Sequence, residues 1–120
     1  MKGSFKFFKH QDGISAFAEV AVESAPSSDF CVKWTSDLAN YERSYGGAVR
    51  EGITQALRWH RDLGGGSAGF TILEFVELVV DTKADAVKCA SAAAAWKALG
   101  HSETDLTFDF DGAWRVTGPT

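Results

Sequence analysis

Residues 45–61 read Tyr-Gly-Gly-Ala-Val-Arg-Glu-Gly-Ile-Thr-Gln-Ala-Leu-Arg-Trp-His-Arg, and this stretch decides the fold. Apolar and small side chains recur in it every three or four residues, which predicts an amphipathic helix with one buried face. The buried stripe comprises Tyr45, Ala48, Val49, Gly52, Ile53, Ala56 and His60. The opposite, solvated side carries Arg50, Glu51, Arg58 and Arg61. Glycines 64–66 follow, and glycine readily adopts the left-handed conformation that ends a helix.

An alanine-rich run predicts a second helix over residues 84–99. Its flat face consists of Ala86, Ala90, Ala93 and Ala94. Small side chains let two helices approach closely, so we expect this face to meet Gly52 on the first helix. Asp81 or Thr82 is expected to cap the second helix by accepting a backbone N–H bond.

The other segments have the period of two that is typical of strands. Strands are predicted at Phe5–Lys9, Phe17–Glu23, Phe30–Trp34 and Phe70–Val80, with a terminal hairpin over Leu106–Val116 that turns at Asp111-Gly112. The order β-β-β-α-β-α plus a hairpin predicts an α+β fold. We expect a two-layer α/β sandwich with a mostly antiparallel or mixed sheet and both helices on one face.

A two-layer arrangement leaves the second face of the sheet without a covering layer. Glu19 and Glu23 alternate with Ala18, Val20 and Val22 in the second strand and point to that uncovered face. Together with Glu77, they predict that the uncovered face is acidic.

The composition is that of one globular domain spanning residues 1–120, with 45% hydrophobic and 23% charged residues. The net charge of −4 argues against a dedicated nucleic-acid binder. Cys31 and Cys89 form no disulfide framework, which predicts a reducing cytoplasmic location. We expect no signal peptide and no membrane span, because no apolar run is long enough for either.

No residue pattern predicts catalysis. The histidines His10, His60 and His101 are scattered and lack metal-ligand spacing. His60 is expected at the edge of the core, favoured by the helix dipole, and His10 in a solvated loop. The glycine run 64–69 follows a helix and precedes a strand, the reverse of a phosphate-binding loop. We therefore predict no catalytic residue, cofactor, metal or bound nucleotide.

Four tryptophans are many for this length. Trp34 and Trp59 are expected to anchor the core. Trp96 lies off the alanine face, and aromatic side chains in such positions are enriched at interfaces. Trp96 and Trp114 are therefore the candidate interface residues for a protein partner or a homodimer.

Several blocks of the sequence occur in the same order as in domain IV of translation elongation factor G, and the chain resembles that family. Residues 9–20, Lys-His-Gln-Asp-Gly-Ile-Ser-Ala-Phe-Ala-Glu-Val, lie where the family has its basic tip hairpin and a following strand. Residues 45–57 are similar to the family's helix. The segment Val80-Asp81-Thr82 is similar to the family's entry into its second helix. The alanine pattern of residues 86–90 is similar to that of the helix itself. The resemblance covers about residues 9–97, and the hairpin at about 105–117 has no counterpart.

The resemblance implies a βαβ unit with a left-handed crossover and a binding role at the ribosome. In elongation factor G the domain tip enters the decoding region, so the candidate RNA or partner contacts are Lys9, His10, Gln11 and Gly13. This chain departs from the family there, because Asp12 adds negative charge and Leu78 replaces a histidine. A chain of 120 residues has no room for the family's guanine-nucleotide domain.

Two functions are therefore expected from the sequence. The first is a non-catalytic, free-standing domain IV-like binding module associated with the ribosome or other RNA. The alternative is a protein-interaction or homodimerising domain that has lost RNA binding. A small enzyme is a third hypothesis, since phosphotransferases of the galactokinase–mevalonate kinase type share the broad fold. Their glycine-rich loop leads into a helix, however, and no such loop occurs here.

Overall fold

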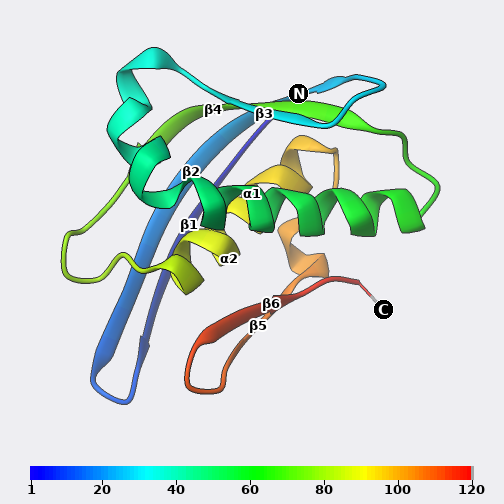
Figure 1. Cartoon of the computed structure of the whole chain (residues 1–120). Helices are drawn as coiled ribbons and strands as arrows, with labels where there is room; N and C mark the ends of the chain where they lie inside the picture. Colours follow the sequence, from blue (N-terminus) through cyan, green and yellow to red (C-terminus); the bar gives the residue numbers. More distant parts are fainter. Residues whose placement is uncertain (120) are drawn as a thin grey trace.

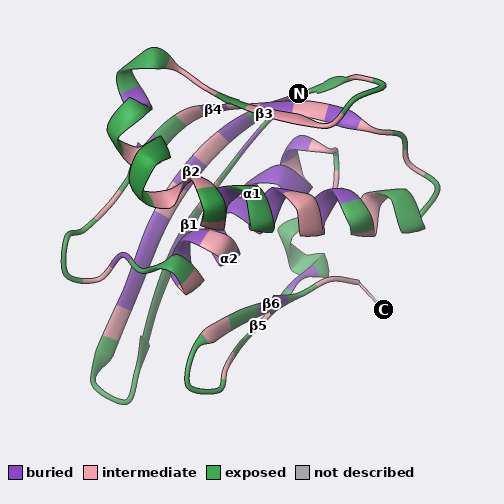
Figure 2. Ribbon diagram, viewed as in Figure 1, coloured by how far each residue is buried: buried purple, intermediate pink, exposed green. Residues whose placement is uncertain are grey.

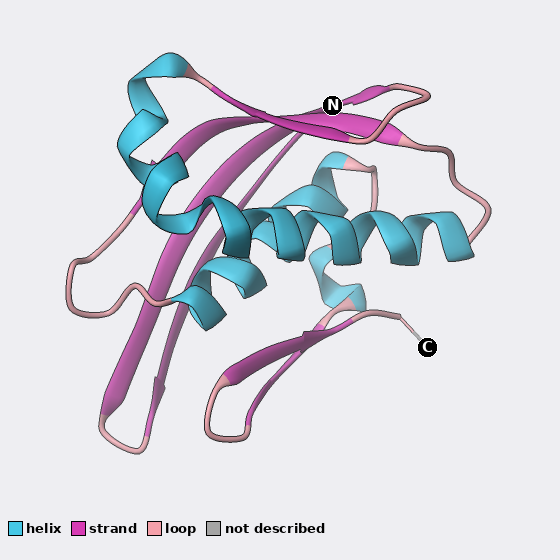
Figure 3. Cartoon of the chain, in the orientation of Figure 1, coloured by secondary structure: helices cyan, strands magenta, loops and turns pink. Residues whose placement is uncertain are grey.

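A four-stranded mixed sheet with two helices on one face forms the body of the protein (Figure 1, Figure 3). The computed structural model describes residues 1–119. The elements are β1 (Lys2–Gln11), β2 (Ile14–Pro26), β3 (Cys31–Trp34), α1 (Ala39–Asp62), β4 (Ala68–Val76), α2 (Ala84–Ala98), β5 (Thr107–Phe110) and β6 (Trp114–Thr117), with short 3-10 turns at Ser36–Leu38 and Glu103–Asp105. The sheet order is β1-β2-β4-β3, and β5 and β6 form a separate sheet. The predicted two-layer α+β fold is confirmed.

The β1–β2 hairpin is longer than the sequence pattern predicts. Its antiparallel register runs from Lys2 opposite Glu23 to Gln11 opposite Ile14. The two-residue turn between the strands has positive φ at both positions, 54° at Asp12 and 78° at Gly13. An Asp-Gly pair suits such a turn, because both residue types tolerate positive φ. The hairpin end extends beyond the helices in Figure 1.

β3 and β4 are parallel neighbours, and α1 joins them. Their register runs from Cys31 opposite Gly69 to Trp34 opposite Ile72. A parallel pair needs a long connection, and α1 supplies it. The structure thus contains the βαβ unit that the resemblance implies.

α2 is buried on nearly all sides (Figure 2). It packs against β1, β2, α1 and β6. A side chain at Gly3 of β1 would overlap the carbonyl oxygen of Ala94, and one at Gly52 of α1 would overlap that of Lys88. The backbones on both sides therefore touch the backbone of α2. The predicted contact of Gly52 with this helix is present, but Gly52 meets Lys88, Ser91 and Ala92, and the predicted alanine face meets β1 at Ala94 instead.

The strand predicted over Phe70–Val80 ends at Val76 instead. Pairing of β4 with β2 stops at Val76 opposite Glu19, and pairing with β3 stops at Ile72. The chain then turns, with the backbone N–H groups of Asp81 and Thr82 both donating to the Leu78 carbonyl. Apolar content alone therefore does not continue the strand once its neighbours end.

The predicted cap of α2 is wrong. The residue before the helix is Lys83, and its side chain makes no capping hydrogen bond. The Thr82 hydroxyl instead donates to the Phe17 carbonyl at 2.7 Å and accepts from the Leu78 backbone N–H at 2.9 Å. Thr82 therefore attaches the β4–α2 loop to β2.

The uncovered sheet face is not acidic as predicted. Lys2 and Lys6 of β1 lie opposite Glu23 and Glu19 of β2, so the two strands carry opposite charges there. Glu77 does not belong to this face, because its carboxylate accepts a hydrogen bond from the Tyr45 hydroxyl on α1. The sequence missed this balance because the lysines and glutamates lie in different strands.

The terminal hairpin turns through residues 111–113, not through the predicted two-residue turn. Phe110 lies opposite Trp114, and the backbone N–H of Asp111 donates to the Ala113 carbonyl. No helix within residues 1–119 has the length and apolar character needed to cross a membrane.

Replacing Gly52 with alanine is expected to lower the free energy of unfolding by about 1–3 kcal/mol, because the new Cβ would overlap the Lys88 carbonyl and lie 2.9 Å from the Ala92 nitrogen. Gly47 in the same helix is the matched control, since a Cβ there meets nothing within 4 Å. Gly47→Ala is expected to stabilise by about 0.5–1 kcal/mol through helix propensity. Urea denaturation measures both, and equal stabilisation by both variants would disprove the close contact.

Candidate functional site

The predicted tip residues lie together at the free end of the β1–β2 hairpin. Lys9, His10, Gln11 and Gly13 are all exposed there. The Lys9 ammonium lies over the Phe108 ring of β5, 5.9 Å from its centroid. His10 Nδ1 is 3.0 Å from the Ser15 hydroxyl across the hairpin. The hairpin therefore presents polar side chains at its tip.

Exposed apolar side chains occur on the hairpin and on the β4–α2 loop that is bonded to it, and the sequence pattern does not predict them. Val79 is 87% exposed and Val80 is 82% exposed, in the β4–α2 loop. On the hairpin itself, Phe8 is 61% exposed and Ile14 is 55% exposed. Figure 2 shows the hairpin end and this loop as largely exposed.

Hydrogen bonds place the β4–α2 loop against the hairpin. The Phe17 backbone N–H donates to the Asp81 carbonyl at 3.0 Å, beside the Thr82 bond to the Phe17 carbonyl. The Phe17 ring in turn packs edge-on against Phe8, with centroids 6.0 Å apart. We call residues 8–14 and 76–80 together the tip surface. The turn signal Asp81-Thr82 could have marked this loop, but the apolar run before it favoured a strand.

The two candidate interface tryptophans differ in exposure. Trp96 is 0% exposed, and its indole N–H lies 3.0 Å from the Ser102 carbonyl and 3.1 Å from a carboxylate oxygen of Asp105. Trp114 is half-buried, its ring packs edge-on against Phe7, and its backbone N–H donates to Asp85. The predicted exposure of Trp96 is wrong because the segment after α2 folds back over that helix, whereas an interface role of Trp114 stays a prediction. Trp34 and Trp59, expected in the core, are only half-buried.

A pair of histidines lies where the C-terminal ends of the two helices meet. His60 Nδ1 and His101 Nε2 are 2.8 Å apart, and the His101 ring stacks on Trp96 with centroids 3.8 Å apart. His60 is half-buried, which confirms its predicted place at the core edge. Burial, and then the charge of His60, lower the pKa of His101 from its ordinary value of 6.5. The nearby Asp105 carboxylate acts in the opposite direction.

The two thiols occupy different environments. Cys89 in α2 is buried, and desolvation raises the pKa of its thiol to about 12. Cys31 in β3 is half-buried and lines a shallow hollow on the sheet with Lys33 and Thr71. Within residues 1–119, no three His, Cys, Asp or Glu side chains are grouped so that they could hold a metal ion.

Comparison with solved structures shows likeness at the level of the fold. A crystal structure of a protein from Thermus thermophilus matches with a TM-score of 0.72 and 21% sequence identity. The match covers 82% of this chain and 15% of that protein, so the chain spans about a seventh of the matched protein's length. No family model and no curated protein matches the sequence. At this identity the likeness shows the shared fold alone.

Thiol reagents are expected to distinguish the two cysteines. A thiol with a pKa near 12 carries almost no thiolate at neutral pH, so buried Cys89 should not react in the folded protein. A native-state assay with a chromogenic disulfide should therefore label one thiol per chain, and denaturant should expose the second. Loss of the rapid reaction in Cys31→Ser identifies the site. Rapid labelling of Cys89 in that variant would contradict the prediction.

Acidification is expected to destabilise the protein through His101. Because the pKa of His101 is lowered in the folded state, the unfolded chain binds more protons near pH 6.5. The free energy of unfolding should therefore fall as the pH drops from about 7.5 to about 5.5. His101→Gln should flatten this dependence. Equal slopes for His101→Gln and the parent protein would rule out this cause.

Proposed function

We propose that this chain is a non-catalytic binding module that contacts a protein partner through the tip surface. The observation that carries the proposal is the exposure of Val79 and Val80 in a loop that is hydrogen-bonded to Phe17 of the hairpin, which also exposes Phe8 and Ile14. Single exposed apolar residues are ordinary, but apolar side chains gathered on neighbouring segments are typical of protein contact sites. The hydrogen-bonded attachment of the loop to β2 holds these side chains in place before any partner binds.

The charges around the tip surface favour a protein over RNA. Asp12 occupies the turn itself, where a phosphate backbone would be repelled. Asp81 adds a second carboxylate beside the valines. The apolar centre of the surface offers no donor to a phosphate, but it can be buried against the apolar part of a protein partner.

A ribosome-associated RNA contact is the second candidate. It is supported by the exposure of Lys9, His10 and Gln11 on one hairpin end and by the resemblance to domain IV of elongation factor G. Gly13 in the turn allows a close approach of the backbone to a ligand. A cytoplasmic location, proposed from the two unpaired cysteines, suits either candidate.

Site-specific crosslinking tests the proposed contact. Val79 is replaced by the photoreactive p-benzoyl-phenylalanine, and the protein is irradiated in a lysate of its source organism. Ser28, exposed in the β2–β3 loop, carries the same group in the control. We expect a discrete adduct from position 79 that protease removes and ribonuclease does not. Unlabelled parent protein should compete for it, whereas the doubly substituted Val79→Ser, Val80→Ser protein should not.

The other outcomes distinguish the alternatives. An adduct of twice the chain mass, together with a dimer in light scattering, identifies a second copy as the protein partner. An adduct that ribonuclease removes would overturn the protein-partner proposal in favour of RNA. Equal crosslinking from positions 79 and 28 would show that the tip surface has no special affinity.

A further inference from the structure

The arginines of this chain are concentrated on one helix. Four of the five lie in α1, namely Arg43, Arg50, Arg58 and Arg61. Arg50, Arg58 and Arg61 are exposed on the side of α1 that faces away from the core. The whole protein has a net charge of −4, so this cluster is a local exception to its acidic character.

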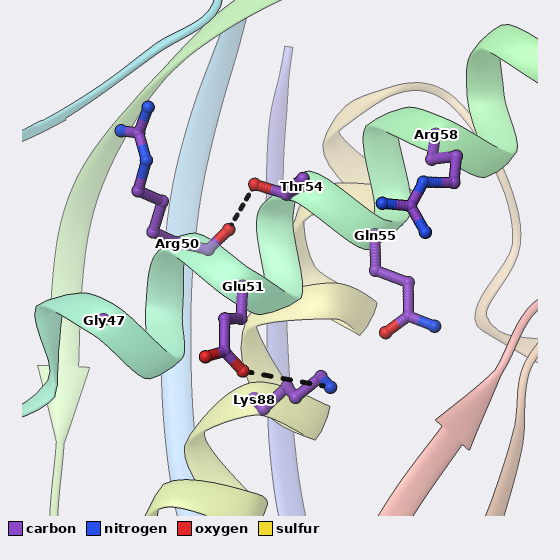
Figure 4. A pocket seen from close by; sticks show the side chains of 7 residues that line it. All are labelled: Gly47, Arg50, Glu51, Thr54, Gln55, Arg58 and Lys88. Atoms are coloured by element: carbon purple, nitrogen blue, oxygen red, sulfur yellow. Dashed lines mark hydrogen bonds and ion pairs between the residues drawn. The ribbon is translucent and has the colours of Figure 1, made fainter.

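Two adjoining hollows follow this side of α1. The first, of about 470 Å³, is lined by Gly47, Arg50, Glu51, Thr54, Gln55, Arg58 and Lys88 (Figure 4). The second, of about 490 Å³, is lined by Phe30, Thr54, Leu57, Arg58, Arg61 and Asp62. Thr54 and Arg58 border both, so the hollows lie side by side along α1, and we call the two together the arginine groove.

The guanidinium groups in this groove are not neutralised by neighbouring carboxylates. Among residues 1–119, none of the ion pairs within 4.0 Å involves Arg50, Arg58 or Arg61. Glu51 is 3.9 Å from the Lys88 ammonium, which occupies that carboxylate (Figure 4). Asp62 borders the far end of the groove and is the other acidic side chain in its lining.

The position of Arg50 is fixed by an aromatic ring. Its guanidinium lies over the Phe30 ring, 4.8 Å from the centroid, and Phe30 packs edge-on against Phe70 of β4. This stacking holds the planar guanidinium without using its N–H donors. Thr54 Oγ1 donates to the Arg50 carbonyl one turn back, so the hydroxyl is directed at the helix and not at the groove (Figure 4).

The spacing of the three arginines fits a ligand with repeated negative charges. Arg50 and Arg61 are separated by about 16 Å along the helix axis at 1.5 Å per residue. A single phosphate cannot reach both, whereas a chain of phosphates can. Arginine forms paired hydrogen bonds with phosphate oxygens, and a cationic groove that follows the backbone is a feature of single-strand binding.

We propose that the arginine groove binds the phosphate backbone of a single-stranded nucleic acid. The groove lies on α1, so it is a different surface from the tip surface on the hairpin and the β4–α2 loop, and its function does not depend on that surface. Gln55, which points into the groove in Figure 4, supplies an amide for contact with a base or sugar.

Salt-dependent binding of fluorescent oligouridylate and oligothymidylate tests this proposal. Parent protein should bind both, because both carry the same backbone charge. The triple variant Arg50→Gln, Arg58→Gln, Arg61→Gln should bind at least about tenfold more weakly. Each lost phosphate contact should reduce the slope of log K against log salt by about 0.7, so the triple variant should lose about 2.

A matched variant removes the same charge from the opposite layer. This triple variant, Lys2→Gln, Lys6→Gln, Lys33→Gln, alters exposed lysines of the sheet. It should leave the affinity and the salt slope nearly unchanged. Urea denaturation checks that each variant is folded. If the triple arginine variant does not fold, the single variant Arg58→Gln replaces it, and its salt slope should fall by about 0.7. Three results would overturn the proposal: equal losses in both triple variants, no binding of either oligonucleotide at low salt, or binding of the protein to phosphatidylserine vesicles alone.

Discussion

The close approach of three backbones at α2 is the constraint on which the rest of the structure depends. Gly3 of β1 touches α2 from one side, and Gly52 of α1 touches it from another. More than half of the residues of α2 are alanine. Because no row of large side chains intervenes, the backbones of β1 and α1 can contact the backbone of α2. Because α2 is buried on nearly all sides, its position is set by the elements packed around it.

This constraint explains the form of the C-terminal segment. A helix of alanines offers little apolar area, so its remaining side is covered by the larger residues of the β5–β6 hairpin and the segment before it. Phe108 stacks on Phe5 and contacts Phe7, and Trp114 packs on Phe7. Trp96 fills the space between α2, Trp59 and the His101 ring. The terminal hairpin therefore completes the core, although it lies outside the resemblance to elongation factor G.

The sequence predicted the elements well, because each has an unambiguous period. The buried stripe of α1 and the alternation in β2 are local patterns. The contact of Gly52 with α2 depends on small side chains. The failures concern contacts between segments far apart in sequence. Val79 and Val80 have the composition of a strand, but β4 has no pairing partner beyond Val76, so the strand ends before them. A helical wheel places Trp96 off the alanine face, but the segment after α2 returns over the helix and buries this side chain. Thr82 is a typical cap residue, but its hydroxyl donates a hydrogen bond to the Phe17 carbonyl, 65 residues away.

The surface charges, too, depend on where the fold places residues and not on composition alone. Net charge is a property of composition, and at −4 it argues against nucleic-acid binding for the chain as a whole. Electrostatic attraction acts over roughly 10 Å at ordinary salt, however, so a ligand responds to the charges nearest to it. Arginine is concentrated on α1, whereas the acidic side chains Asp12 and Asp81 lie by the tip. The protein therefore has an apolar, partly acidic end and a cationic helix side, and the two proposed contacts use different residues.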